Sequence, residues 1–237
     1  LEFRRVLFRS LGAETEGMVG YLLEQALGNR MPAERRVATL LTQVEVDPSD
    51  PAFERPTKPI GPVYERAEAE RLAADGGWSI APDGEGWRRV VPSPLPRRIV
   101  GVEVVRLLLA HDVVVICAGG GGIPTVRSDD PGPPGGDGIL TGVEAVVDKD
   151  RAGALLAEAV GADAYLMLTD VPAVVDGWGG PAPREIARAT PEALGDRRFE
   201  AGSMGPKVEA ACAFVRRTGR VAAIGRLGDA AAVLAGS

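Results

Sequence analysis

Histidine and cysteine are both scarce in this chain, and each shortage excludes a class of function. The single histidine, His111, lies beside Asp112 and is predicted to be a surface residue, so a hydrolytic Ser-His-Asp triad has no support. The two cysteines, Cys117 and Cys212, lack the spacing of a disulfide framework or of a CxxC metal site. We therefore expect both thiols to fill the core.

Long apolar runs and an excess of positive charge are missing as well. The longest apolar stretches, such as residues 113–118, are far shorter than the ~20 residues that a membrane-spanning helix needs. The formal net charge of −6 argues against a nucleic-acid binder and against a protein held at a membrane surface by basic residues. We expect a soluble cytoplasmic protein with neither nucleic acid nor membrane as a partner.

The chain does contain enough apolar residues for a core, and they follow a repeated rhythm of helix and strand. Hydrophobic residues make up 45% of the 237 positions, which suits one domain with an appendage. Three predicted helices each lead into an apolar strand, at residues 99–110 and 113–118, 149–160 and 164–169, and 206–217 and 221–224. Continuous apolar strands are typical of a parallel sheet that is buried on both faces, so we predict an α/β fold.

Residues 47–96 differ from the rest of the chain, because prolines surround one short charged helix, predicted at residues 64–74. We interpret this stretch as a small protruding lid subdomain. The core would then consist of residues 11–46 and 97–237. Its first part is predicted to hold a helix at residues 12–29 and a β-type run at residues 37–46.

Two further segments stand outside this core. Residues 1–10 lack a starting Met and have neither the shape of a signal peptide nor clean amphipathicity, so we expect a cloning or sequencing scar there. Residues 129–138 are rich in Pro, Gly and Asp, and we predict a surface loop whose role the sequence does not tell.

The predicted strand at residues 113–118 ends directly in four glycines followed by Ile-Pro. The glycines are Gly119, Gly120, Gly121 and Gly122. In open α/β sheets ligands bind at the carboxyl ends of strands, and glycines let backbone N–H groups approach an anion without a Cβ in the way. No Gly-Lys-Ser/Thr follows, so this is not a Walker loop. The residues alone support an anion cradle and a structural turn equally.

The next core strand ends in Thr169, Asp170 and Val171. Because the carboxyl ends of parallel strands share one edge of a sheet, these residues are predicted to lie on the same edge as the glycines. An Asx-type turn is the structural alternative.

Only three of the 27 basic residues are lysines, and each lies in a segment suited to phosphate. Lys149 follows Asp148 at a helix start, where the ordinary interpretation is an Asp cap beside a solvated Lys. Lys207 lies in the first turn of a helix, where the dipole disfavours a cation unless an anion shares the site. Lys58 lies between prolines that stiffen its backbone. Either genomic base composition left three lysines by accident, or these positions need an ammonium that arginine cannot replace.

Six motifs over residues 11–227 together resemble carbamate kinases, a branch of the amino acid kinase family. They are Leu-Thr-Gln-Val-Glu-Val-Asp-Pro, Pro-Thr-Lys-Pro-Ile-Gly-Pro, Gly-Trp-Arg-Arg-Val-Val-Pro-Ser-Pro, Gly-Gly-Gly-Gly-Ile-Pro, Gly-Val-Glu-Ala-Val-Val-Asp-Lys-Asp and Gly-Ser-Met-Gly-Pro-Lys. The resemblance implies a three-layer αβα sandwich with a mostly parallel central sheet and a protruding lid. It also implies a homodimer and Mg²⁺-dependent phosphoryl transfer between ADP and carbamoyl phosphate, giving ATP and carbamate, in arginine metabolism.

The same resemblance implies roles for individual residues. Lys58 would reach the transferred phosphoryl group, Lys149 and Lys207 would contact the phosphates, and Asp148 would orient the lysines. The four glycines Gly119, Gly120, Gly121 and Gly122 would line the carbamate side. The nucleotide side would be formed by Thr169, Asp170, Val171, Gly202, Ser203 and Met204. No protein side chain is implied as a metal ligand.

The family pattern also has two earlier segments, Gly-Gly-Asn and His-Gly-Asn-Gly-Pro, that this sequence does not contain. We therefore expect an N-terminally truncated carbamate kinase without its first strands, and whether this incomplete chain is active by itself stays open. Two alternatives remain at this point. One is a non-catalytic nucleotide-binding remnant, and the other is an amino acid kinase that acts on another small acid.

Overall fold

The computed structural model describes residues 7–130, 132, 136–195, 197, 199 and 204–235. The helices are α1 (Leu7–Gly28), α2 (Arg66–Gly76), α3 (Val102–Ala110), α4 (Lys149–Val160), α5 (Pro191–Gly195), α6 (Met204–Thr218) and α7 (Ala230–Ala235). Short 3-10 turns occur at η1 (Pro51–Phe53), η2 (Gly119–Gly121) and η3 (Leu227–Asp229). Among the described residues, no helix combines the length and the apolar character needed to cross a membrane.

Thirteen strands accompany these helices in the described part of the chain. They are β1 (Val37–Thr39), β2 (Gln43–Val46), β3 (Lys58–Tyr64), β4 (Ser79–Asp83), β5 (Gly86–Val91), β6 (Pro96–Ile99), β7 (Val114–Ile116), β8 (Ile123–Arg127), β9 (Leu140–Gly142), β10 (Ala164–Thr169), β11 (Val174–Asp176), β12 (Arg184–Ile186) and β13 (Val221–Arg226). β1 pairs with β7, β2 with β8 and β10 with β13, each in parallel register. Antiparallel partners extend the β2–β8 ladder alone, because β6 pairs with β2 and β9 with β8.

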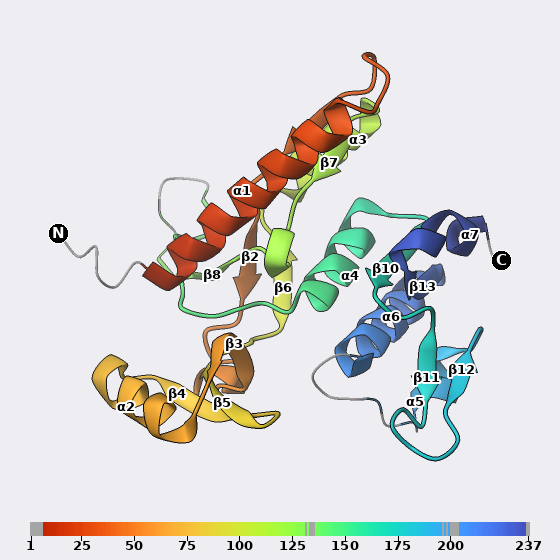
Figure 1. The fold of residues 1–237 in the computed structure, drawn as a ribbon. Coiled ribbons are helices and arrows are strands. Elements are labelled where there is room, and N and C mark those ends of the chain that lie inside the picture. The colour runs from red at the N-terminus through yellow and green to blue at the C-terminus, as the bar shows by residue number, and fades with distance from the viewer. Residues whose placement is uncertain are drawn as a thin grey trace.

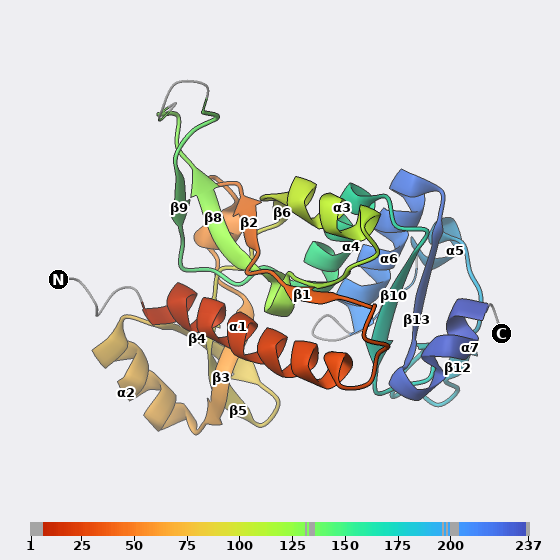
Figure 2. The same cartoon turned by 90° about the horizontal axis from the view of Figure 1, so that it is seen from above.

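The elements stack in three layers, which confirms the predicted αβα fold. Figure 2 shows β1, β10 and β13 between one helical layer with α3, α4 and α6 and a second layer with α1 and α7. The helix-then-strand rhythm produces this arrangement, since each helix returns the chain across the sheet to the next parallel strand.

The core gathers where α4 meets β2 on one side and α6 on the other. Val44, Val147 and Ala152 are at most 1% exposed and belong to one apolar cluster. A second cluster joins α4 to α6 through Phe214, whose ring lies 5.7 Å from that of Tyr165. Full burial of a side chain such as Phe214 contributes about 1.5–3 kcal/mol to stability. This packing fixes the starting points of α4 and α6 relative to each other.

The strands are less covered than their apolar sequences predict. β7 is shorter than the predicted strand at residues 113–118 and its three residues are only half-buried, while Met167 is the one fully buried residue of β10. Among the described residues, β7 and β10 each pair with a single strand, so each ladder is open along both sides. The prediction that these strands are buried on both faces is therefore wrong for this structure.

Several predicted boundaries also move. The helix predicted from residue 99 begins instead at Val102, because Gly101 takes a left-handed φ of 71° and Ile99 ends β6. The β-type run at residues 37–46 divides into β1 and β2. In the predicted loop at residues 129–138, positions 131 and 133–135 lie outside the described residues. Asp137 in that loop forms ion pairs with Arg98 and Arg127 at 3.0 and 2.6 Å.

The predicted scar at residues 1–10 falls only partly within the structure. Residues 1–6 lie outside the described residues, while residues 7–10 form the first turn of α1. The Arg9 guanidinium donates to the carbonyl oxygen of Gly142 at 2.5 Å. The origin of these ten residues stays a prediction.

β3, β4 and β5 form a separate antiparallel sheet that α2 packs against, and Figure 1 shows this unit projecting away from the layers. The helix predicted at residues 64–74 corresponds to α2. Trp87 lies under the guanidinium of Arg66 at 5.3 Å, and Trp78 lies under that of Arg89 at 4.8 Å, so aromatic and basic residues together hold the unit closed. The division into core and lid at residues 47 and 96 stays a prediction. The unit carries Lys58 at the first position of β3.

Candidate active site

A cavity of about 630 Å³ lies where the N-termini of α4 and α6 meet the carboxyl end of β10. Helix N-termini present free N–H groups and the positive end of the helix dipole, and strand ends at such an edge are the usual ligand position in α/β sheets. The residues that line the cavity are Lys58, Asp148, Lys149, Asp150, Thr169, Asp170, Val171, Ala173, Val175, Gly177, Trp178, Phe199, Met204, Pro206 and Lys207. The three lysines predicted from the sequence thus meet at one cavity that is suited to an anion.

Lys58 connects the lid sheet to the core. Its Nζ donates to Oδ2 of Asp148 at 2.7 Å, although 90 positions separate the two residues in the sequence. The Lys58 side chain is 32% exposed, whereas that of Asp148 is 9% exposed. The ion pair therefore holds the lid to the start of α4 while the ammonium keeps access to the cavity.

Asp148 uses its two carboxylate oxygens for different partners. Oδ1 accepts hydrogen bonds from the backbone amides of Asp150 and Arg151 at 3.0 and 3.3 Å, and so caps α4. Burial alone would raise the pKa of Asp148, but the hydrogen bond and charge of Lys58, together with the two amides, hold that pKa below its ordinary value. Asp148 is an ionised cap, and its contact with Lys58 supports the predicted orienting role.

Lys207 makes the second ion pair, deeper in the protein. Its Nζ lies 2.7 Å from Oδ2 of Asp150, and the two side chains are 11% and 9% exposed. The hydroxyl of Tyr165 donates to the backbone oxygen of Asp150 at 2.8 Å. Burial, and then the charges of Asp150 and Asp148, raise the pKa of Tyr165, so its hydroxyl remains a hydrogen-bond donor.

Asp150 and Tyr165 are functional candidates that sequence reasoning missed. The Asp-Lys-Asp triplet was the available signal for Asp150, but only the fold reveals that its second acid meets Lys207, 57 positions away. Tyr165 lies in an apolar strand and gives no comparable signal.

Lys149 is the least constrained of the three lysines. Its Nζ lies 3.8 Å from Oδ2 of Asp150, and its side chain is 63% exposed. Three ammonium groups therefore lie with the two carboxylates of Asp148 and Asp150 around the start of α4, an excess of one positive charge at this end of the cavity, while Asp170 adds a third carboxylate elsewhere in the lining. The exposed Lys149 ammonium at this end can attract a phosphate or carboxylate.

The rest of the cavity lining is mostly apolar, with Asp170 as its one charged side chain in the part of the chain that the structure describes. The predicted nucleotide-side residues that lie there are Thr169, Asp170, Val171 and Met204, whereas Gly202 and Ser203 lie outside the described residues. Trp178, which was not selected from the sequence, lines the same cavity and is 67% exposed. Its position between glycines in the connection from β11 to β12 was the only sequence signal. The exposed indole of Trp178 adds a flat apolar surface to a lining that also includes Val175 and Met204.

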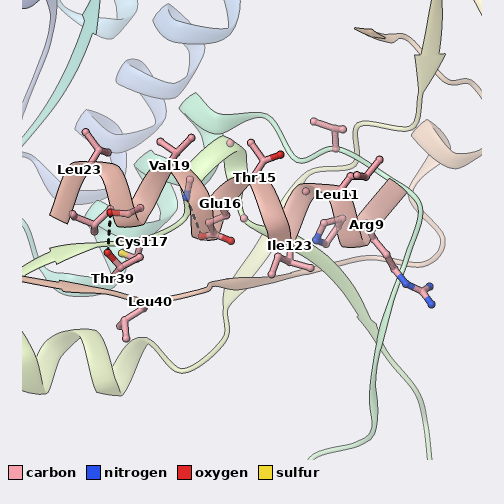
Figure 3. A pocket seen from close by; sticks show the side chains of 18 of the residues that line it. Arg9, Leu11, Thr15, Glu16, Val19, Leu23, Thr39, Leu40, Cys117 and Ile123 are labelled. Carbon is pink, nitrogen blue, oxygen red and sulfur yellow. Dashed lines mark hydrogen bonds between the residues drawn. The ribbon is translucent and has the colours of Figure 1, made fainter. Parts of the chain in front are cut away.

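The four glycines after β7 lie at a different cavity, of about 340 Å³, beside α1 (Figure 3). Gly119, Gly120 and Gly122 line it, while Gly121 is buried and faces α4. A Cβ on Gly121 would lie 2.1 Å from the backbone oxygen of Val147, so only glycine fits this approach. The structure does not bring the glycines together with the lysines in one cavity, but it packs the loop against the start of α4.

Three of the four glycine amides are already bonded within the protein. The Gly119 amide donates to Oε1 of Glu16 at 3.1 Å, and the amides of Gly121 and Gly122 donate at 3.1 Å to backbone oxygens of the same turn. This bonding favours the structural turn over an open anion cradle. The predicted contact of the glycines with carbamate stays a prediction.

Comparison with known proteins gives consistent matches over nearly the whole chain. The model of the amino acid kinase family matches residues 10–225, a span that includes all three lysines. The chain is 54% identical over 226 residues to a carbamate kinase of Haemophilus influenzae, which covers 95% of this chain and 71% of that protein. It is 54% identical over 224 residues to a carbamate kinase of Rhizobium meliloti, covering 94% of this chain and 68% of that protein.

Solved structures agree with these sequence matches. A carbamate kinase from Giardia lamblia bound to citric acid superposes with a TM-score of 0.84 at 38% identity, covering 96% of this chain and 72% of that one. The same Giardia lamblia enzyme bound to AMP-PNP superposes with a TM-score of 0.81, again at 38% identity and with the same coverage.

Proposed function

The chain belongs to the amino acid kinase family and, within it, to the carbamate kinases, and from this membership we propose that it transfers a phosphoryl group between carbamoyl phosphate and ADP. The products in that direction are ATP and carbamate. The observation that carries the proposal is the convergence of Lys58, Lys149 and Lys207, from three separate segments, on one cavity at two helix N-termini.

Phosphoryl transfer needs this kind of site because the protein contributes little covalent chemistry. The reaction depends on holding the donor and acceptor oxygens in line and on neutralising charge on the transferred group. Ammonium groups are compact point charges that can follow a moving phosphoryl group, which the planar guanidinium of arginine does less well. The scarcity of lysine elsewhere in the chain is consistent with selection of the ammonium at these three positions.

We propose different roles for the three lysines from their surroundings. Lys58, on the lid and half-exposed, leaves Asp148 to contact the transferred phosphoryl group. Lys149 is exposed and loosely held, and it binds the nucleotide phosphates as they enter. Lys207 stays fixed to Asp150 and provides a permanent positive charge at the start of α6.

The mostly apolar part of the cavity lining supports the binding of a nucleotide there. Thr169, Asp170, Val171 and Met204 would line the path of the nucleotide, and the exposed indole of Trp178 would contact its base. Aromatic faces stack on nucleobases regardless of sequence, so such a surface suits the base of ADP. Carbamate would lie toward the glycine turn.

We propose that Mg²⁺ enters this cavity together with the nucleotide. Within the described residues, no group of three or more His, Cys, Asp or Glu side chains is placed to hold a metal ion. Asp148 and Asp150 are oxygen donors of the kind that Mg²⁺ prefers, but each already holds a lysine at 2.7 Å. The nucleotide phosphates would therefore supply most of the Mg²⁺ ligands that the protein does not provide. When bound, the ion neutralises phosphate charge.

We also propose a cytoplasmic homodimer that acts in arginine metabolism. Met18, Tyr21 and Leu22 lie at helical spacing on α1 and are all exposed, and an apolar surface of this kind is typical of a contact between proteins. Light scattering on the purified chain at micromolar concentration is expected to give the mass of a dimer. The mass of a monomer would contradict this part of the proposal.

The reaction itself can be tested with the 237-residue chain, carbamoyl phosphate, ADP and Mg²⁺. Luciferase is expected to detect ATP, and Lys58→Ala and Lys207→Ala are each expected to slow its formation by at least about 10²-fold. Arg217→Ala is the matched control, because Arg217 is an exposed cation of α6 that does not line the cavity. Binding of ADP without ATP formation would contradict the proposal and would favour a nucleotide-binding remnant. ATP formation only from another acyl phosphate would favour a different acid as substrate.

A further inference from the structure

Glu16 is a buried carboxylate that the proposed reaction does not use. It is 6% exposed and shares one face of α1 with Gly20, where a Cβ would lie 2.3 Å from a side-chain carbon of Thr39. Because α1 lies close to Thr39 of β1 at Gly20, the side chain of Glu16 on the same helix face is buried. No lysine or arginine of the described residues forms an ion pair with it, so its charge is balanced by other groups.

Backbone amides of two distant segments provide that balance. Oε1 of Glu16 accepts from the amide of Gly119 at 3.1 Å and from that of Thr42 at 3.3 Å, and Oε2 accepts from the Thr42 amide at 3.4 Å. Burial raises the pKa of Glu16, and these amide hydrogen bonds oppose the rise. Figure 3 shows the Glu16 side chain pointing from α1 into the wall of the smaller cavity. One carboxylate therefore joins α1, the β1–β2 connection and the glycine turn.

The turn that Glu16 holds contains a strained residue. Ala118 has a φ of 54°, one of two positive values among the non-glycine residues described. Its amide donates to Oγ1 of Thr42 at 2.8 Å, so Thr42 and Glu16 hold two successive amides of the turn. Without these acceptors, the segment from Ala118 to Gly122 keeps only the hydrogen bonds that its own amides make within the turn.

The glycine turn also contacts the start of α4. Gly121 approaches the backbone oxygen of Val147 so closely that a Cβ would lie 2.1 Å away, and the next residue, Asp148, caps α4 and holds Lys58. We propose that Glu16 is a positioning residue for phosphoryl transfer, because it fixes the glycine turn against α4 and thereby fixes the Asp148–Lys58 pair at the cavity. This inference rests on the proposed function.

The experiment compares Glu16→Ala, Glu16→Gln and Glu14→Ala. Glu14 is the exposed acidic neighbour on α1 and serves as the matched control. Glu16→Ala is expected to lower kcat about tenfold while the KM for ADP changes less than about twofold, because the reacting groups are misplaced but the nucleotide wall is untouched. Glu16→Gln keeps an acceptor for the Gly119 amide and is expected to restore kcat to within about threefold of the wild type.

Amide hydrogen exchange of the same variants gives a readout that does not need turnover. Glu16→Ala is expected to speed exchange both at residues 118–123 and at residues 147–151, whereas Glu14→Ala is expected to change neither. Faster exchange in the glycine turn alone, or an unchanged kcat, would overturn the inference. If Glu16→Ala does not fold, Thr42→Val removes the acceptor for Ala118 and is expected to give the same two-segment pattern. A wild-type chain that makes no ATP would refute the proposed function, while the exchange pattern would still decide whether Glu16 controls α4.

Discussion

The two lysine–carboxylate pairs of the large cavity have the same length and different surroundings. Lys58–Asp148 and Lys207–Asp150 both measure 2.7 Å, but the Lys58 side chain is 32% exposed on a lid strand, and the Lys207 side chain is 11% exposed on a core helix. Both carboxylates are 9% exposed, but Asp148 also accepts hydrogen bonds from two backbone amides, and the Lys58 ammonium regains water when it leaves its partner. Equal distances therefore describe an exchangeable contact in one pair and a fixed part of the fold in the other.

Replacing Lys207 tests the fixed pair and should have the largest effect. Lys207→Ala leaves the buried carboxylate of Asp150 with only the exposed ammonium of Lys149, 3.8 Å away, as a counter-charge, so we expect the free energy of unfolding to fall by up to about 3–5 kcal/mol. Urea denaturation measures this change. Arg217→Ala breaks an exposed ion pair with Glu158 on the same helix and should cost about 1 kcal/mol or less. Equal losses in the two variants would erase the contrast between buried and exposed pairs.

Replacing Lys58 tests the exchangeable pair through activity rather than stability. Lys58→Ala is expected to lower kcat by about 10²–10³, the size of effect seen when one charge-stabilising donor is removed. The free energy of unfolding should fall less than in Lys207→Ala, because two backbone amides still donate hydrogen bonds to the buried carboxylate of Asp148. Steady-state kinetics and urea denaturation on one preparation separate the two quantities. Lys58→Arg should also be slow, and a normal rate in that variant would show that the ammonium itself is not required.

Asp148→Asn keeps the helix cap but removes the charge that faces Lys58. Asn caps helices as well as Asp does, so we expect a loss of about 1 kcal/mol, from the weaker hydrogen bond to Lys58. The pKa of Asp148 lies below its ordinary 3.8 in the folded protein, so its contribution is complete above that value and disappears as the pH falls through the folded pKa. Denaturation curves should therefore separate wild type from variant at neutral pH and converge in acid. A gap that widens in acid would contradict this assignment.

Tyr165→Phe makes the smallest change near the buried pair. The variant loses the hydrogen bond to the backbone oxygen of Asp150 but keeps the ring against Phe214, so we expect a loss of about 1 kcal/mol in the free energy of unfolding. Thermal unfolding measures it, with Tyr21→Phe on the exposed face of α1 as the control. A loss as large as that of Lys207→Ala would mean that the hydroxyl, and not the ion pair, fixes Asp150.

The lysines could be located from the sequence and Asp148 followed from the family resemblance, but which acid meets which lysine could not be told, and the reason is physical. Lys58 and Lys207 stand out locally, through stiff prolines and an unfavourable place on a helix, so one-dimensional reasoning can find them. Their carboxylates lie 90 and 57 positions away, and only tertiary packing decides which acid meets which lysine. The glycine turn shows the same limit, because the acceptor for the Gly119 amide is Glu16, 103 positions earlier.

Strand burial was mispredicted for a related reason. Apolar sequence predicts that a strand can be covered, but coverage depends on how many neighbours the strand has. β7 and β10 each pair with one strand among the described residues, so their apolar side chains remain half-exposed. The α/β class could be predicted because periodicity is a local property of the sequence. The number of strands in each ladder depends on pairing between distant segments, so it could not.

The distribution of the three tryptophans gives this protein a built-in optical readout. Trp78 and Trp87 lie on the lid beneath guanidinium groups, and Trp178 lies exposed at the cavity wall. Two fluorophores therefore report on the projecting unit of β3, β4, β5 and α2, and the third reports on the large cavity. Solvent exposure shifts indole emission to longer wavelength, so the red edge of the spectrum comes mainly from Trp178. Intrinsic fluorescence can consequently report on the arrival of a ligand at the cavity and on changes in the projecting unit, both in one unlabelled sample.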